Sequence, residues 1–372
     1  MIYKLFNPFD EFDVTKTIWV DLLKRCDSSF FTSWEWISTW IHSLPKDTDL
    51  QLVVGYFDEQ PVLAFFIGRH QRTRHGFLPT KAIVLNTTGN PYFDKLTIEY
   101  NSILLDSRVI EDKDSLFRFL SGLPWDEFVL PGISQEFISN LDFFSNRYFP
   151  VITDRSSESH FVDLQKIRDS GMDYLILLSA NRRSQIRRSI KEYEKDGKIQ
   201  CQQAASSEEA LSMLNELARL HEQAWQSRSV TGAFSNKYFS QFHKDLIANY
   251  FDTGNIQLLH VFNERETIGY LYNFIYCRKV LFYQSGLNYS AGNQYRPGLV
   301  SHYFAILHNV ARNIDTYDFL AGDADYKKSL GTNSVPMYWI RLIKSNSRYR
   351  LETNTIKIKQ TIKTLWKRHK AA

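Results

Sequence analysis

The chain has 372 residues, of which 43% are hydrophobic and 15% aromatic, a composition that supports buried cores and excludes a disordered protein. No stretch approaches 18 uncharged apolar residues, so no membrane span is predicted. The net charge of +4 is uneven, because residues 344–372 carry +8 and leave −4 on the rest of the chain.

Three cysteines, Cys26, Cys201 and Cys277, lie far apart without the spacing of a metal or redox site. The first residues show no basic start followed by an apolar run, as a secretory signal would. We therefore expect a cytoplasmic protein.

An internal repeat is the first sign of organisation along the chain. The stretch "QLVVGYFDEQPVLAFF" (51–66) aligns without gaps with "QLLHVFNERETIGYLY" (257–272), and both predict a hairpin of two strands around a polar turn. An aromatic helix precedes each hairpin, over 30–40 and over 234–246. We infer two copies of one α/β unit.

The second copy is expected to follow a polar, aperiodic segment near 153–170. The pattern then predicts helices over 180–195, 206–228, 235–250 and 298–313, strands over 279–287, 316–320 and 337–344, and a short helix after Gly322. The predicted fold class is α+β, with mixed, mostly antiparallel sheets flanked by helices. The predicted domains are 1–160 and 161–345, followed by a basic amphipathic tail, 346–372.

Several common catalytic motifs are missing from the sequence. It has no Walker loop, Rossmann glycine fingerprint, HExxH, CxxC pair or GxSxG elbow. No metal site is predicted. Any chemistry must rely on oriented backbone groups and a few ionisable side chains.

Three stretches, "YQSGLNYS", "YRPGLVSHYFAILHNVA" and "YDFLAGDADYKKSL", carry a family resemblance. Together they resemble the acetyltransferase family named for CelD/BcsL, within the GNAT superfamily of N-acetyltransferases. The resemblance implies tandem GNAT-like folds. The N-terminal copy has no Arg-Pro-Gly helix start or Gly-Asp corner, so it is expected to be degenerate. The chain is also similar to the Fem-type transferases, tandem GNAT folds that use aminoacyl-tRNA.

The resemblance implies acyl-CoA, either acetyl-CoA or a longer acyl-CoA, between splayed strands 279–287 and 316–320. The candidate cofactor-binding residues start the next helix: Arg296, Pro297, Gly298 and Leu299. Gly298 permits close approach of a ligand to the backbone, and the helix start attracts phosphate. The usual superfamily loop, Gln/Arg-x-x-Gly-x-Gly/Ala, is incomplete here, so an ordinary helix cap is the alternative.

Amine acylation needs a base and an acid for the departing thiolate. The resemblance implies Tyr326 as the acid, and a buried aromatic is its alternative. Asp323, directly after Gly322, is the first choice for the base. Asp325 suits a cap of the short helix, and Asp318, which alternates with apolar neighbours, suits either face of its strand. His302 suits a second base or a packed histidine.

The cluster "NRRSQIRR" places Arg183 and Arg187 on one helical face, with Arg182 beside them. This arrangement suits an anionic acceptor such as a sugar nucleotide or tRNA. A solvated helix face is the alternative.

Trp225, Arg228 and Lys327 are further candidates for substrate binding. Trp225 and Arg228 follow a long helix, where an acceptor pocket and simple packing are both consistent. Lys327 suits a phosphate or carboxylate, or an exposed position without a role.

The tail "TIKIKQTIKTLWKRHK" places Ile358, Ile362, Leu365 and Trp366 on one helical face and lysines on the other. It is suited to peripheral contact with an anionic inner membrane, and a flexible solubilising tail is the alternative.

The function predicted from these features is acyl transfer from acyl-CoA to an amine or hydroxyl of a sugar-containing acceptor, in cell-envelope or exopolysaccharide biosynthesis. Two rivals stay open. One is an aminoacyl-tRNA-dependent, Fem-like transferase, and the other is a non-catalytic scaffold of a polysaccharide assembly complex.

Overall fold

A computed structural model describes the residues in ranges 1–74, 78–106, 112–227, 229–289, 292 and 294–345. The predicted tail, 346–372, and Arg228 lie outside these ranges. Within them, every helix is too short or too polar to cross a bilayer.

The first half begins with a strand and two helices and continues into the first predicted hairpin. Its elements are β1 (Ile2–Phe6), α1 (Phe12–Leu23), α2 (Trp34–Ser43), β2 (Leu50–Phe57), β3 (Gln60–Arg74), β4 (Leu78–Leu85), β5 (Leu104–Leu105), α4 (Lys113–Gly122), β6 (Glu127–Ser134), α5 (Gln135–Leu141) and β7 (Val151–Asp163).

The second half repeats the order of helix, hairpin, helix and strand. Its elements are α6 (Leu164–Ser170), α7 (Ala180–Tyr193), β8 (Gln200–Gln203), α8 (Ser207–Gln226), α9 (Lys237–Tyr250), β9 (Ile256–Phe262), β10 (Thr267–Tyr276), β11 (Lys279–Leu287), α10 (Pro297–Val310), β12 (Thr316–Ala321), α11 (Asp325–Leu330) and β13 (Asn333–Ile343). The two predicted hairpins are confirmed as β2–β3 and β9–β10, with the aromatic helices α2 and α9 before them.

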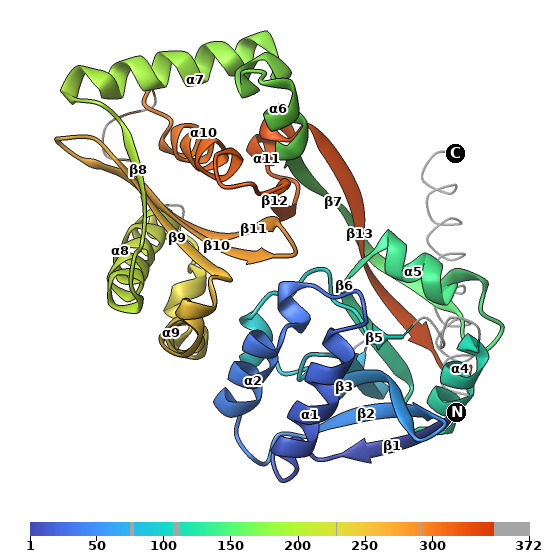
Figure 1. Cartoon of the computed structure of the whole chain (residues 1–372). Helices are drawn as coiled ribbons and strands as arrows, with labels where there is room; N and C mark the ends of the chain where they lie inside the picture. Colours follow the sequence, from blue (N-terminus) through green and yellow to red (C-terminus); the bar gives the residue numbers. More distant parts are fainter. Residues whose placement is uncertain (75–77, 107–111, 228, 290–291, 293, 346–372) are drawn as a thin grey trace, which may run out of the picture.

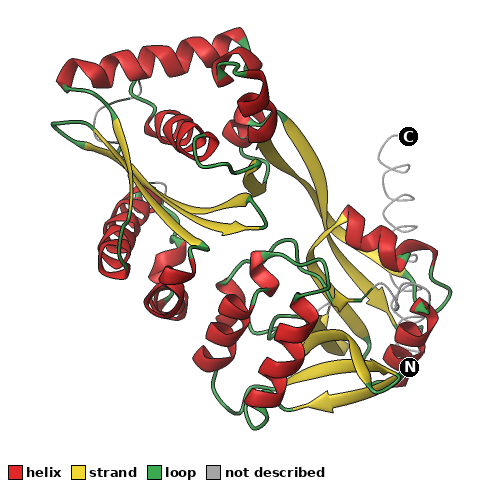
Figure 2. Ribbon diagram, in the orientation of Figure 1, coloured by secondary structure: helices red, strands yellow, loops and turns green. Residues whose placement is uncertain are grey.

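The described strands form one sheet in the order β1-β2-β3-β4-β6-β13-β7-β12-β11-β10-β9-β8, with β5 beside β3. Two neighbouring pairs are parallel, β4 with β6 and β11 with β12, and each has a helix in its crossover. Each parallel pairing covers three residue pairs, and β11 continues to Leu287 without β12 as a partner. The predicted mostly antiparallel sheet flanked by helices is therefore confirmed (Figure 2).

Two long strands, β7 and β13, connect the halves (Figure 1). One end of β13 pairs with β6 of the first half, while one end of β7 pairs with β12 of the second. Residues 153–160, which we expected to be an aperiodic connection, are instead part of β7. The prediction failed there because backbone pairing with β13 holds the strand, whatever the polarity of its side chains.

Helices cover both faces of the sheet, and one core is common to the two halves. On one face, α1 and α2 lie against β2 and β3, while α8 and α9 lie against β9 to β11. The halves meet through aromatic rings, with centroids 4.8 Å apart for Trp36 and Phe242 and 4.1 Å apart for Phe30 and Phe274. The opposite faces are covered by α4 and α5 in one half and by α6, α7 and α10 in the other.

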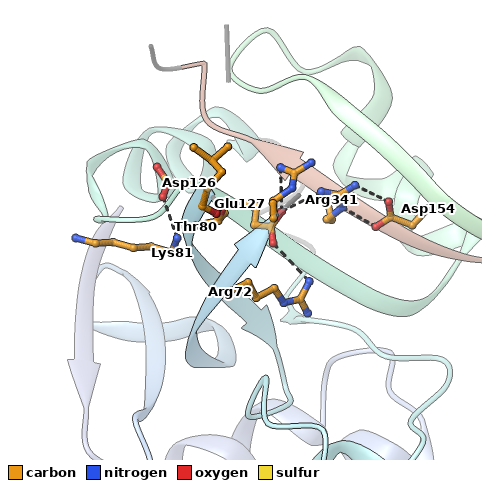
Figure 3. Close-up of polar contacts among 9 residues, drawn as sticks. Arg72, Thr80, Lys81, Asp126, Glu127, Asp154 and Arg341 are labelled. Atoms are coloured by element: carbon orange, nitrogen blue, oxygen red, sulfur yellow. Dashed lines mark hydrogen bonds and ion pairs between the residues drawn. The ribbon is translucent and has the colours of Figure 1, made fainter. Parts of the chain in front are cut away.

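A buried carboxylate connects the strands where β13 enters the first half (Figure 3). Glu127, at the start of β6, is 1% exposed and accepts a hydrogen bond from Arg341 Nη1 at 2.9 Å. Arg341 also donates to both carboxylate oxygens of Asp154 on β7, at 2.6 and 2.7 Å. Arg72, from β3, donates to Glu127 at 3.4 Å. Arg341 therefore fastens β13 to both of its neighbours.

We predict that Arg341→Met lowers the free energy of unfolding by about 3 kcal/mol, because it leaves the buried Glu127 with weaker partners. Urea unfolding followed by circular dichroism measures this loss. Arg72→Met is the matched control, with an expected loss under about 1 kcal/mol, because Arg72 is more exposed and its contact is longer. Equal losses in the two variants would contradict this role of Arg341.

Candidate functional site

A cavity of about 740 Å³ lies where β11 and β12 diverge, at the start of α10. Both halves of the chain line it, because Thr97 and Glu99 reach it from the first half. It brings together nine of the residues singled out in the sequence: Arg182, Trp225, Arg296, Gly298, Leu299, His302, Asp325, Tyr326 and Lys327. Pro297 is the buried first residue of α10 and does not line the cavity.

The start of α10 is shaped to receive a ligand. Arg296 precedes the helix with a left-handed backbone (φ 44°), and Pro297 occupies the first helical position without an N–H to satisfy. A Cβ added to Gly298 would meet one neighbour within 4 Å, the end of the Leu287 side chain at 3.2 Å. The helix dipole favours an anion at this position.

Two arginines provide positive charge beside this helix start. Arg182, from the first turn of α7, lines the cavity with Arg296. Burial and the nearby charge of Arg296 lower the pKa of Arg182, while Asp325 on the cavity wall acts in the opposite direction. Two guanidinium groups near one helix start match a phosphate or pyrophosphate group.

Tyr326, in the first turn of α11, lines the cavity and stacks on His302 with ring centroids 5.4 Å apart. Burial raises the pKa of Tyr326, so the hydroxyl stays protonated at physiological pH.

His302 is buried, and its Nδ1 lies 3.0 Å from the hydroxyl of Tyr317. Burial lowers the pKa of His302 to about 3, so the ring is neutral at physiological pH. Of the two interpretations of His302, the structure favours the packed histidine.

The candidate carboxylates are dispersed. Asp323 is exposed and does not line the cavity, and Ser157 Oγ donates to it at 3.1 Å. Asp325 lines the cavity beside Arg182. Asp318 is buried and accepts from Ser159 Oγ and from the Leu320 N–H, both at 2.7 Å.

Glu99 is the residue that the sequence analysis missed. It is 6% exposed, lines the cavity, and accepts from the Ala321 N–H at 2.6 Å through Oε2. Burial raises its pKa to about 7, against the opposing effects of that hydrogen bond and of Lys327. The available signal was a lone carboxylate between Ile98 and Tyr100, in the otherwise uncharged stretch 96–105.

Lys327 is part of the same buried group. Its Nζ donates to the carbonyl oxygens of Leu320 and Ala321, at 3.1 and 2.8 Å, and burial lowers its pKa. The hydroxyl of Tyr100 donates to Asp318. Glu99, Lys327 and Asp318 are thus joined through the backbone groups of Leu320 and Ala321 at the end of β12, in a network that includes residues of both halves.

The predicted acceptor-binding residues fall into two places. Trp225 lines the cavity, where its ring lies 5.8 Å from that of His221. Arg183 and Arg187 lie outside the cavity and line a separate shallow hollow of about 380 Å³ along α7, together with Arg188. Among the residues described, no cluster of three metal-ligand side chains occurs.

We predict that His302 contributes to acid lability. Its pKa is lower in the folded chain than in the unfolded chain, so its contribution is complete above pH 6.5 and is lost as the pH falls toward 3. The loss between pH 6.5 and 5 amounts to about 2 kcal/mol. His302→Gln, which preserves a polar partner for Tyr317 but does not titrate, should reduce the loss by this amount in urea unfolding at pH 7.5 and 5. An unchanged loss would contradict the neutral assignment.

Comparisons with known proteins agree with this geometry. Residues 180–328 match the model of the acetyltransferase (GNAT) domain, and no curated protein matches the chain in sequence. The fold is similar to that of FemX, with a TM-score of 0.56 at 10% identity over 94% of this chain and 99% of that one.

Two further solved structures have the same fold. The structure of L-PGS from Bacillus licheniformis gives a TM-score of 0.51 at 10% identity, over 92% of this chain and 95% of that one. The C-terminal domain of a putative lysylphosphatidylglycerol synthetase from Agrobacterium fabrum gives 0.52 at 11% identity, over 91% and 95%. The chain therefore has a GNAT-type acyltransferase fold, and all residues that line its cavity except Thr97 and Glu99 lie in the part that matches the GNAT domain.

Proposed function

We propose that the protein is an acyltransferase that moves an acyl group from acyl-CoA, acetyl-CoA in the first instance, to an amine or hydroxyl of a sugar-containing acceptor. One observation supports this most strongly: the cavity between two diverging parallel strands opens onto a helix start with two arginines. The N-terminal half is proposed to be a degenerate copy that does not bind the donor.

The residues of the cavity suit the parts of this reaction. Arg296 and Arg182 would hold the donor's phosphates at the start of α10, and Gly298 leaves room for a close approach. When bound, acyl-CoA supplies the activated acyl group. Tyr326 would give its proton to the departing thiolate, and its buried hydroxyl is in the required protonated form.

The acceptor is proposed to bind in the same cavity, which Trp225 and Glu99 also line. A role in cell-envelope or exopolysaccharide biosynthesis follows from the resemblance to the CelD/BcsL family. Peripheral contact with the inner membrane is proposed for the tail, 346–372.

An aminoacyl-tRNA-dependent transferase is the second candidate. It is favoured by the outer face of α7, where Arg183, Arg187, Arg188 and Lys191 lie together just outside the cavity. Such a face suits the phosphates of an RNA whose 3′ end enters beside Arg182. The third candidate, a scaffold, requires the same fold without donor binding.

We predict that calorimetric titration with acetyl-CoA shows binding in the micromolar range. Arg296→Ala should weaken binding at least about tenfold through the loss of a charge-assisted hydrogen bond. Gly298→Trp should abolish it, because the indole would fill the helix start. Arg219→Ala, an exposed arginine of α8 paired with Glu216, is the control and should bind like the wild type.

The other outcomes separate the rivals. If no acyl-CoA binds, the acyl-CoA proposal is wrong. Binding of charged tRNA that is lost in Arg183→Glu and Arg187→Glu would then support the Fem-like candidate. Binding of neither donor would support the scaffold.

A further inference from the structure

The segment 96–102 of the first half occupies the place that the cavity occupies in the second half. Both places lie where a parallel strand pair stops, β4 with β6 and β11 with β12. In the first half, Asn101 provides the hydrogen-bond partners for the backbone groups of the diverging strand ends. Its Nδ2 donates to the carbonyl oxygens of Leu85 and Pro131 at 3.0 and 3.1 Å, and its N–H donates to that of Gly132 at 2.9 Å.

The packing of this segment leaves little space. Gly132 has a φ of 63°, and a Cβ there would lie 2.5 Å from the carbonyl oxygen of Ile98. Asn86 donates to the side chain of Asn101 at 2.8 Å and holds it in place. The first half therefore fills its own strand divergence with chain, and the same segment carries Glu99 across to the second half.

Glu99 is held firmly at the wall of the second-half cavity. One carboxylate oxygen accepts from the Ala321 N–H, and Lys327 binds the carbonyl oxygen of the same residue. Tyr326 and Gly298 line the same cavity. Glu99 therefore shares the cavity with both the predicted acid and the predicted donor site.

A second polar group lies near Glu99. The hydroxyl of Tyr283, on β11, is buried and has no hydrogen-bond partner among the residues described, and Tyr283 lines the cavity. Burial is the main cause of the raised pKa of Tyr283, and the charge of Glu99 raises it further. A buried hydroxyl without a partner is costly, and a polar substrate group in the cavity would satisfy it.

We infer that Glu99 is the general base of the acyl transfer and that the acceptor is a primary amine. This inference rests on the proposed function and deepens it. An ammonium group is attracted to a buried carboxylate, whereas a hydroxyl holds its proton far more strongly than a carboxylate does. The base thus comes from the half that does not bind the donor.

The step balances as follows in atoms and charges. Glu99 takes one proton from the ammonium, which leaves a neutral amine. The amine nitrogen attacks the thioester carbonyl carbon, so that a C–N bond forms and the C–S bond breaks. The thiolate leaves with the electron pair of that bond and receives a proton from Tyr326, which regains one from the acylated nitrogen. The products are an amide, a thiol and one proton on Glu99.

The test is thiol release from acetyl-CoA in the presence of glycinamide, ethanolamine or D-glucosamine as amine probes. With wild-type protein, at least one amine should accelerate release, and the rate should rise with pH to a plateau above about 7. Glu99→Gln preserves the acceptor for the Ala321 N–H but cannot take a proton. We expect it to bind acetyl-CoA normally and to lose roughly 10²-fold or more in rate at pH 7.

A purely structural role would not change the pH profile, but loss of a base does. The rate of Glu99→Gln should recover toward wild type as the pH approaches the pKa of the free amine, because the amine then needs no base. Glu158→Gln, an exposed carboxylate on β7, is the neutral control.

Three results would overturn the inference. The first is an unchanged rate in Glu99→Gln. The second is that Asp323→Asn, instead of Glu99→Gln, loses rate at pH 7 and recovers it at high pH. The third is normal acetyl-CoA binding with no amine accelerating release. Failure to bind acetyl-CoA at all is a different result, because it counts against the proposed function itself.

Discussion

Backbone groups at the end of a strand must find hydrogen-bond partners when the neighbouring strand turns away. This chain meets that requirement twice, because two parallel pairings each stop after three residue pairs. In the first half, Asn101 supplies the partners from the chain itself. In the second, Glu99 and Lys327 bind Ala321, and the rest of the divergence is a cavity. The same strand geometry thus gives a filled site in one half and an open site in the other.

The filled site and the open site depend on each other through the shared sheet. Because β7 of the first half pairs with β12 and β13, and β13 of the second half pairs with β6 and β7, neither half has a complete sheet without the other. The common aromatic core between α2 and α9 adds a second rigid connection. Glu99 is therefore held against β12 by a framework that spans the chain, and a catalytic distance across the two halves can be as well defined as one within a single domain.

Local signals in the sequence predicted local structure. The Arg-Pro-Gly turn marked the start of α10 because proline fits the first helical turn, and the alternating apolar residues marked both hairpins. The segment 153–160 was missed because a polar strand held by backbone pairing with β13 shows no apolar alternation. Glu99 was missed for a different reason: its partner, Ala321, lies 222 positions away, and no local pattern encodes such a contact. Asp323 looked suitable in sequence, yet it is exposed and turned toward Ser157.

The position of Glu99 also suggests why a duplicated unit retains both copies. In a single copy, one strand divergence would have to contain the donor site, the base and the acceptor site. Burial of the donor would then compete with access for the acceptor. With two copies, the arginines and helix start lie on the second half, while the carboxylate reaches the cavity from the first. Burial by both halves raises the pKa of Glu99 to about 7, which is the range a base needs near neutral pH. The copy whose strand divergence is filled by its own chain thereby supplies a buried carboxylate to the cavity of the other copy.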